Sequence, residues 1–230
     1  MLRDHCFRTI LLAAVILTLN GTLSADDPFP APAGMKLVYS HDFEDHTMAR
    51  YEPTDSSAWK LQQDSKNAVA SLIKRNSDFK PPHRSPLNRT LIRDLTVDSF
   101  VMDIRLQSTI PDYGHRDLCL FFGYQDDAHL YYVHFGKQMD DHANQIFIVN
   151  DAPRTKISTS TTKGTPWTDD WHQARIVRLA ETGEIRIYFD DLSKPIMTAT
   201  DKSFPRGRLG FGSFDDTGNF DDIRIYTPTP

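Results

Sequence analysis

Arg116, Tyr132 and His134 combine a cation, a phenol and an imidazole within 19 positions of the chain, a set able to bind an anion and to transfer protons. Tyr132 and His134 alternate with other residues in LYYVHFG (130–136), and Arg116 lies upstream in YGHRD (113–117). In β-elimination from a uronate polymer, an arginine neutralises the carboxylate, a histidine removes the C5 proton and a tyrosine protonates the leaving oxygen. The alternatives are that these side chains bind a sugar without reacting, or that they are ordinary polar residues of a solvated strand.

Other polar and aromatic residues near this trio also suit sugar binding. Aromatic rings stack on pyranose rings, while guanidinium and amide groups bind hydroxyl groups or a carboxylate. The additional binding candidates are His115, Lys137, Gln145 and Trp167. Trp167 lies in a loop (164–170), where its ring either stacks on a sugar at the rim of a groove or folds down over Trp171.

Sequence motifs of other catalytic sites are missing. A retaining glycosidase needs two carboxylates about 5–5.5 Å apart. No Glu-x-Asp-x-x-Glu occurs, and the possible substitutes, Asp103 and Asp117, each also fit an outward-facing strand residue. The chain also lacks a His-x-x-x-His or Cys-x-x-Cys zinc pattern, a Gly-x-Ser-x-Gly elbow and a phosphate loop. These absences count against hydrolase and nucleotide-dependent chemistry.

The candidate residues must be held in place by β-strands, because apolar residues recur with a period of two. They occupy every second position from 100 to 106 and again from 131 to 135. The odd-numbered side chains of 131–135 are therefore expected in the core. The even-numbered ones, including His134, are expected to face outward into a groove.

The rest of the chain continues this pattern. Further strands are predicted at 145–149, 171–179, 184–190 and 220–226. Turn-forming residues separate these segments, no segment has a sustained helical period, and the best position for a helical turn is 56–59. Asp greatly outnumbers Glu among the 31 acidic residues, which also disfavours helices. Many short strands with regular turns predict an all-β, two-sheet antiparallel sandwich.

The N-terminus has the pattern of a secretory signal peptide. Arginines precede the apolar run TILLAAVILTL (9–19), and small residues follow up to Ala25. We predict a signal peptide at 1–25, a Pro-rich lead-in at 26–34 and a folded domain at 35–227. The apolar run is shorter than the ~20 residues of a membrane span. We therefore expect secretion, to the extracellular space or a periplasm, with no membrane span after cleavage.

Charge and cysteine content limit the remaining functions. The formal net charge of −5 provides no basic field for nucleic acid or an anionic membrane surface, so we expect neither partner. Beyond the predicted signal peptide, Cys119 is the only cysteine, so no disulfide can form within the mature chain. Cys119 lies between two leucines, which favours a small buried hydrophobe over a nucleophile.

The C-terminal third resembles a known fold superfamily. The motifs are WHQARIVR (171–178), ETGEIRIYFDD (181–191) and GRLGFGSFDDTGNFDDIRIY (207–226), with a weaker match at KLVYSHDFED (36–45). They resemble the concanavalin A-like lectin/glucanase superfamily of the laminin-G type. The resemblance implies a jelly-roll β-sandwich whose last strand closes a sheet beside the first. It says little about activity, because this fold hosts lectins, hydrolases, lyases and spacers.

The same resemblance implies a structural Ca²⁺ at the closing strand. In FDDIRIY (220–226), Asp221 shares the phase of the apolar residues and is expected on the core side, where a carboxylate needs donors or a cation. In the resembled fold such an aspartate joins acids of the first strand, here Asp42 and Glu44, with backbone carbonyls completing the oxygen shell. The alternative is that backbone N–H groups cap Asp221.

These observations predict a secreted, single-domain β-sandwich that binds carbohydrate and takes part in polysaccharide recognition or processing. One alternative is an enzyme on the same scaffold, either a polysaccharide lyase using Arg116, Tyr132 and His134 or a glycoside hydrolase similar to the 3-keto-disaccharide hydrolases. Another is a non-catalytic interaction or spacer domain at the cell surface.

Overall fold

The computed structural model describes residues 29–64 and 67–229. The predicted signal peptide (1–25) lies outside the described residues and stays a prediction. Every described strand belongs to the compact unit formed by residues 31–230. In the part of the chain that the structure describes, no helix has the length and apolar character needed to cross a membrane.

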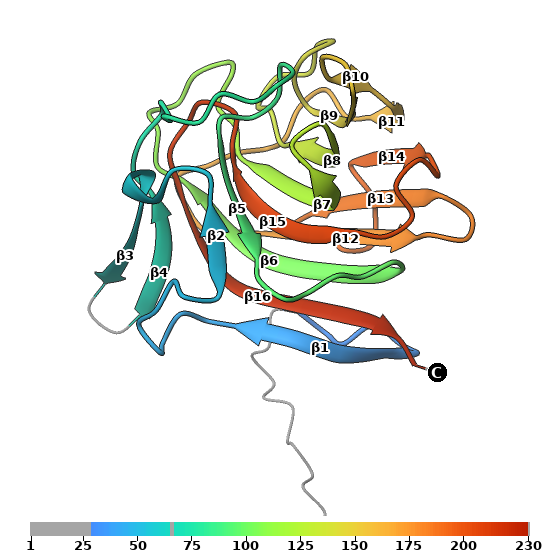
Figure 1. Ribbon diagram of the computed structural model, residues 1–230, viewed down its shortest axis with the longest axis horizontal. Helices are drawn as coiled ribbons and strands as arrows, with labels where there is room; N and C mark the ends of the chain where they lie inside the picture. The colour runs from blue at the N-terminus through green and yellow to red at the C-terminus, as the bar shows by residue number, and fades with distance from the viewer. Residues whose placement is uncertain (1–28, 65–66, 230) are drawn as a thin grey trace, which may run out of the picture. The chain divides into compact units, whose positions relative to one another are not determined.

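Two antiparallel sheets make up this unit (Figure 1). The nine-stranded one, called the large sheet, contains β1 (Met35–His41), β3 (Trp59–Asp64), β4 (Asn67–Leu72), β6 (Phe100–Ser108), β11 (Ser158–Thr161), β12 (His172–Leu179), β13 (Glu184–Phe189), β14 (Met197–Thr200) and β16 (Gly218–Pro228). The seven-stranded one, called the small sheet, contains β2 (Tyr51–Pro53), β5 (Asn88–Ile92), β7 (Cys119–Asp126), β8 (His129–His134), β9 (Gln145–Asn150), β10 (Thr155–Lys156) and β15 (Arg208–Ser213). A 3₁₀ helix, η1 (Ser56–Ala58), lies where a helical turn is predicted.

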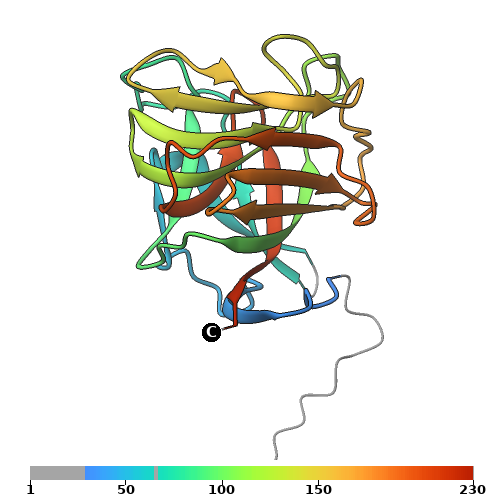
Figure 2. The same ribbon diagram turned by 90° about the vertical axis from the view of Figure 1, so that its right-hand side faces the viewer.

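The strand orders confirm the predicted two-sheet antiparallel jelly-roll sandwich. The large sheet has the order β11-β14-β13-β12-β6-β16-β4-β3, with β1 beside β16. Its β12, β13 and β14 lie side by side at one end (orange in Figure 2). The small sheet has the order β10-β9-β8-β7-β15-β5-β2.

The main hydrophobic core lies between the sheets, and period-two alternation explains which side chains fill it. On β6, Met102, Ile104 and Leu106 are buried in this core. Arg105 and Gln107, in the opposite phase, reach the outer face of the large sheet. The strands β8, β9, β12 and β13 likewise lie where the alternation predicts them.

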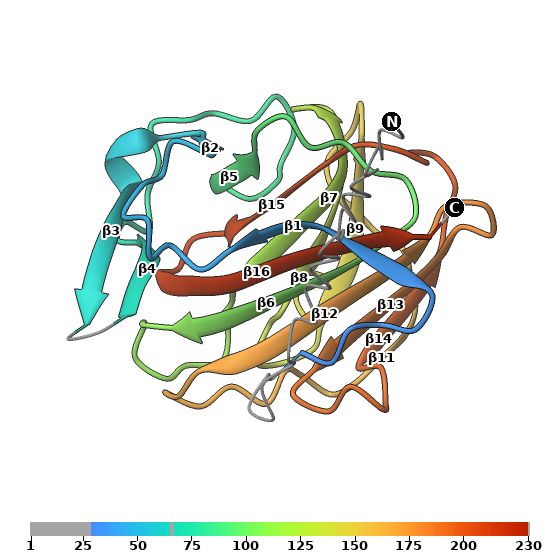
Figure 3. The ribbon, with the colours of Figure 1, turned by 90° about the horizontal axis from the view of Figure 1, so that it is seen from below.

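The last strand, β16, connects two parts of the large sheet (Figure 3). One edge of β16 pairs with β6. The other edge pairs first with β4 and then with β1. The last strand therefore closes the sheet beside the first strand, as the sequence resemblance implies.

A β-bulge in β16 corrects one prediction. The pairing with β6 is interrupted between Asp221 and Arg224, and Asp222 adopts a left-handed backbone at φ 48°. The extra residue shifts the alternation by one position. Asp221 consequently lies opposite Arg105, on the outer face of the sheet. The prediction that Asp221 points to the core side is wrong for this reason.

The outer face of the small sheet carries a second apolar cluster. Its members are Cys119, Phe121, Leu130, Tyr132, Phe147 and Val149. Tyr131 and Val133 face the main core as predicted, so the phase of β8 is confirmed. The predicted open furrow is wrong, because Tyr132 is fully buried and His134 is only 5% exposed.

Candidate functional site

The three residues predicted for β-elimination do not converge. Arg116 is buried, and its guanidinium donates to Ser108 Oγ and to Asp169 Oδ1, both at 2.9 Å. These contacts hold Arg116 toward the large sheet, whereas Tyr132 and His134 project from the outer face of the small sheet. The structure therefore does not bring Arg116 together with Tyr132 and His134.

Tyr132 and His134 also have their own partners. The Tyr132 hydroxyl accepts a hydrogen bond from Arg154 Nη1 at 3.0 Å. The Nε2 atom of His134 lies 3.6 Å from Asp117 Oδ2. Burial, with the nearby Arg154 charge, lowers the pKa of His134 to about 3, so the imidazole is neutral at physiological pH.

Two of the remaining binding candidates are engaged by other groups of the protein. Lys137 forms an ion pair with Asp112. Trp167 is buried and donates from its indole N–H to the Phe135 carbonyl at 2.6 Å. Its ring packs edge-on against His172 and Phe189, so it folds down into the protein as one alternative predicted, although not over Trp171.

The structure does bring His115 and His134 together. Both line a pocket of about 240 Å³ at the end of the small sheet, called the histidine pocket. Its other lining side chains include Arg84, Asp117, His142 and Arg154. Gln145, the remaining candidate, pairs with His134 in the sheet and donates its side-chain amide to the Asp140 carbonyl at 3.0 Å.

Burial controls the protonation of the acids beside this pocket. It raises the pKa of Asp117 to about 7, even though the Phe214 N–H donates to its carboxylate. Burial, reinforced by the Asp117 charge, also raises the pKa of the Cys119 thiol. At neutral pH Cys119 therefore stays a protonated thiol, as expected for a small buried hydrophobe.

A larger depression lies on the outer face of the large sheet. Its volume is about 460 Å³, and an adjoining hollow of about 310 Å³ shares Gln62 and Asn219 with it. The side chains that characterise this outer-face groove are Gln62, Asn67, Arg105, Gln107, Trp171 and Asn219. Side-chain amides, one cation and one indole thus line a single surface.

Strand register aligns part of this groove into a row. Asn219 on β16 pairs with Ser71 on β4 and with Gln107 on β6, so the three side chains share a face. The Asn219 amide donates to Gln107 Oε1 at 2.9 Å, and the Ser71 hydroxyl donates to Asn219 Oδ1 at 2.6 Å. Gln107 in turn donates to the Asp169 carbonyl at 3.0 Å. These bonds fix the orientation of the Gln107 and Asn219 side-chain amides, which are called the amide row.

Trp171 lies beside the amide row, just before β12. Of the three tryptophans, Trp59 and Trp167 are buried and Trp171 is partly exposed. The Arg105 guanidinium lies 5.0 Å from the centre of the Trp171 ring and also pairs with Asp222 at 3.4 Å. The cation is thereby neutralised, and the indole is held in place by the guanidinium.

The acids predicted to bind calcium each accept a hydrogen bond from a nitrogen. Asp42 accepts from the Glu44 N–H at 3.3 Å, and Glu44 accepts from the Ala68 N–H at 2.7 Å. Asp221 accepts from the Asn67 side-chain amide at 2.9 Å. Among the described residues, the groups of three possible metal ligands do not include these acids. The calcium site stays a prediction without geometric support.

The outer-face groove is not among the sites predicted from the sequence, although its residues carry recognisable signals. Arg105 and Gln107 occupy the polar phase of a strand that the alternation already predicted. Trp171 and Asn219 lie inside the motifs on which the resemblance rests. What the sequence could not supply was their register across β4, β16 and β6, because those strands are far apart in the chain.

Comparisons with known proteins place the fold. Neither family models nor curated proteins match this chain. Among solved structures, it is similar to domain 4 of the extracellular arabinanase AbnA from Geobacillus stearothermophilus, solved with arabinotriose (TM-score 0.58, 11% identity, 85% of this chain and 94% of that chain). It is also similar to the carbohydrate-binding module CBM66 from Bacillus subtilis (TM-score 0.55, 14% identity, covering 78% of this chain and 97% of that chain).

A plant lectin has the same architecture. Winged bean acidic lectin, solved with methyl-α-D-galactose, has a TM-score of 0.54 and 12% identity, covering 82% of this chain and 97% of that chain. At such identities the similarity concerns the fold alone. The chain has the two-sheet, concanavalin A-like jelly-roll fold that its sequence motifs imply.

Proposed function

We propose that this protein is a secreted carbohydrate-binding protein and that it binds a neutral oligosaccharide or polysaccharide in the outer-face groove. The observation that carries the proposal is the amide row beside the partly exposed Trp171. Secretion rests on the predicted signal peptide at 1–25.

The chemistry of the groove matches a sugar in two ways. An indole offers an apolar face on which a pyranose or furanose ring can stack. Side-chain amides offer both donors and acceptors, which hydroxyl groups require. The amides of Gln107 and Asn219 are already oriented by hydrogen bonds, so binding loses little side-chain entropy.

Charge favours a neutral glycan over a uronate polymer. Arg105 is the cation of the groove, and Asp222 lies 3.4 Å from it. Asp221, opposite Arg105 in the sheet, adds further negative charge. A uronate carboxylate would have to compete with these acids for the guanidinium.

The similar structures support binding as the function. One is a carbohydrate-binding module, one was solved with arabinotriose and one with a methyl galactoside. The lyase alternative receives no such support, because Arg116 is held away from Tyr132 and His134.

Affinity electrophoresis and calorimetry on a panel of neutral and acidic polysaccharides test the proposal. We expect a neutral glycan to retard the wild-type protein without being shortened. Trp171→Ala should weaken that binding at least about tenfold, or ~1.4 kcal/mol, because the stacking surface is lost.

A matched pair of glutamine variants tests the location. Gln107→Ala, in the amide row, should weaken binding, while Gln138→Ala, an exposed glutamine outside the groove, should not. A wild-type protein that is silent on the whole panel contradicts the function. Full binding by Trp171→Ala contradicts the site.

A further inference from the structure

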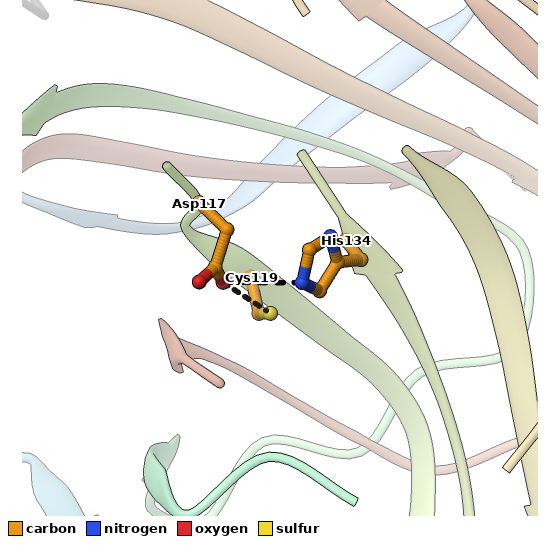
Figure 4. Close-up of side chains that lie close together, drawn as sticks. All are labelled: Asp117, Cys119 and His134. Atoms are coloured by element: carbon orange, nitrogen blue, oxygen red, sulfur yellow. Dashed lines mark hydrogen bonds and ion pairs between the residues drawn. The ribbon is translucent and has the colours of Figure 1, made fainter. Parts of the chain in front are cut away.

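Three possible metal ligands converge at one end of the outer face of the small sheet (Figure 4). Cys119 on β7 and His134 on β8 are directly paired, so their side chains share a face. Asp117 precedes Cys119 by two residues and projects to the same side. Figure 4 shows the three side chains, called the Asp–Cys–His cluster, pointing toward one another.

The separations in this cluster suit a small tetrahedral ion. Asp117 Oδ2 lies 3.4 Å from Cys119 Sγ and 3.6 Å from His134 Nε2. All three ligand atoms lie within 4.8 Å of one another. Zinc bonds of about 2.0 Å to nitrogen or oxygen and about 2.3 Å to sulfur place tetrahedral ligands about 3.3–3.7 Å apart. The cluster is close to three corners of such a site.

Asp117 supplies an independent indication of a ligand. Its Oδ2 accepts hydrogen bonds from the Phe214 N–H at 3.1 Å and from the Ser213 hydroxyl at 3.3 Å. Its buried Oδ1 has no hydrogen-bond partner among the described residues. The oxygen that faces Cys119 and His134 is Oδ2, and a metal ion bound there neutralises the buried carboxylate as a whole, which offsets the cost of its unpaired Oδ1. Asp117 also lines the histidine pocket, which offers a route for the ion.

Charge balance favours a divalent cation. One thiolate and one carboxylate cancel its charge, so the bound site adds no net charge to a buried region. Binding releases the Cys119 thiol proton to solvent and moves the ring proton of His134 from Nε2 to Nδ1. That transfer gives up the 3.4 Å hydrogen bond from the Asn144 N–H to Nδ1 and leaves two N–H groups facing each other, a cost that the metal–ligand bonds must exceed.

We propose that the Asp–Cys–His cluster binds a divalent transition-metal ion, for which zinc is the best match. Thiolate and imidazole ligands select zinc and its transition-metal neighbours over calcium and magnesium, which take oxygen ligands. Three protein ligands leave the fourth position to water or a ligand from the histidine pocket. The cluster belongs to the small sheet and is therefore separate from the outer-face groove of the large sheet.

Zinc and cobalt binding to the full chain test the proposal. After stripping with a chelator, reloading with zinc and dialysis under reducing conditions, the protein should retain about one equivalent of zinc by elemental analysis. Cobalt(II) should give a thiolate-to-metal charge-transfer band. Cys119→Ser should abolish the band, and Asp117→Asn and His134→Ala should each weaken zinc binding at least about tenfold.

Controls distinguish this cluster from other sites. Cys6→Ser removes the other cysteine of the chain and should leave the cobalt band unchanged. His142→Ala, in the pocket but outside the cluster, should retain zinc. Zinc should also raise the thermal midpoint of the wild type, a result that needs no variant. Retention below about a tenth of an equivalent, a band that survives in Cys119→Ser, or stabilisation by calcium alone would overturn the proposal.

Discussion

The outer faces of the two sheets show how the same strand alternation produces opposite surfaces. On the large sheet, the outward residues of β6 and β16 form an open groove of amides, a guanidinium and an indole. On the small sheet, the outward residues of β7, β8 and β9 form a buried aromatic cluster. The alternation decides which way a side chain points, and the segments that cross the sheet decide whether it meets solvent.

Arginines from neighbouring segments cover the outer face of the small sheet. The guanidinium of Arg154, which follows β9, lies 4.9 Å from the Phe147 ring centre and 4.2 Å from that of Phe214. Arg84, between β4 and β5, lies 5.3 Å from the Phe214 ring. The Arg154 N–H donates to the Arg84 carbonyl at 3.1 Å, which joins the two covering segments. On the large sheet, Arg105 lies over the Trp171 ring, and the amide row beside it lines a groove.

The largest expected difference between the faces is in chemical accessibility. Cys119 is fully buried and its thiol pKa is raised by burial, so alkylation in the native Cys6→Ser protein should be at least about a hundredfold slower than in urea. The rate of labelling by a thiol reagent, followed by mass spectrometry, measures this. Rapid labelling of the native protein would show that solvent reaches Cys119 readily. The outer face of the small sheet would then be nearly as accessible as that of the large sheet, which contradicts the comparison.

The next largest effect is on stability. Arg154→Ala removes the donor to the Tyr132 hydroxyl and two ring contacts, so it should lower the free energy of unfolding by about 2–3 kcal/mol. Arg105→Ala on the open face should cost less than about 1 kcal/mol, because its partner and its ring are partly exposed. Urea denaturation of both variants makes the comparison. Equal losses would contradict the distinction between a covered and an open face.

Trp171→Ala separates binding from folding on the open face. We expect the free energy of unfolding to change little, within about 0.5–1 kcal/mol, because the indole is only partly buried. The binding loss described above should therefore appear in a fully folded protein. Circular dichroism and urea titration check the fold beside the glycan assay. A loss of folding would make the indole a structural residue instead.

The smallest expected effect is the pH dependence due to Asp221. Burial raises the pKa of this carboxyl to about 6, so the folded state holds its proton more tightly than the unfolded state. The stability contributed by Asp221 should therefore fall as the pH rises from about 4 to about 6, by about 1 kcal/mol when partial solvent screening is allowed for, and the difference between the wild type and an Asp221 variant isolates it. Asp221→Asn, which can still accept from Asn67, should flatten this slope in unfolding titrations.

The same titration tests the calcium prediction. A calcium ion on Asp221 would favour the ionised carboxylate and lower its pKa. Adding calcium should then remove the slope and raise the midpoint of the wild type but not of Asp221→Asn. Identical unfolding curves with calcium and with chelator would contradict the predicted calcium site at Asp221.

Several features of the fold followed from the sequence, either from local alternation or from the resemblance to a known fold. The alternation on β6 and β8 correctly separated core side chains such as Ile104 and Val133 from outward ones. That step needs no information about partner strands, since alternation is a local property of extended backbone. The closing strand beside the first strand came from the resemblance of 220–226 to a known fold, and the pairing of β16 with β1 confirms it.

Other features needed the assembled structure. The bulge at Asp222 reversed the predicted side of Asp221, and a bulge depends on pairing with β6 that a single strand does not reveal. Arg116 looked available for catalysis, yet Ser108 and Asp169 hold it in the interior. In both cases the partner that sets the side chain's position lies on another segment of the chain. The spacing of residues within one segment therefore could not predict that position.

The fold class and the phase of its strands are predictable from the sequence, because period-two alternation and turn residues act over a few neighbouring positions. Which outward residues are open and which are covered emerges from the folded domain. It placed Asn219 between Ser71 and Gln107, and it brought Asp117 and Cys119 to His134. Such groupings depend on strand order and on the segments that cross each sheet, and both are set by packing of the whole domain.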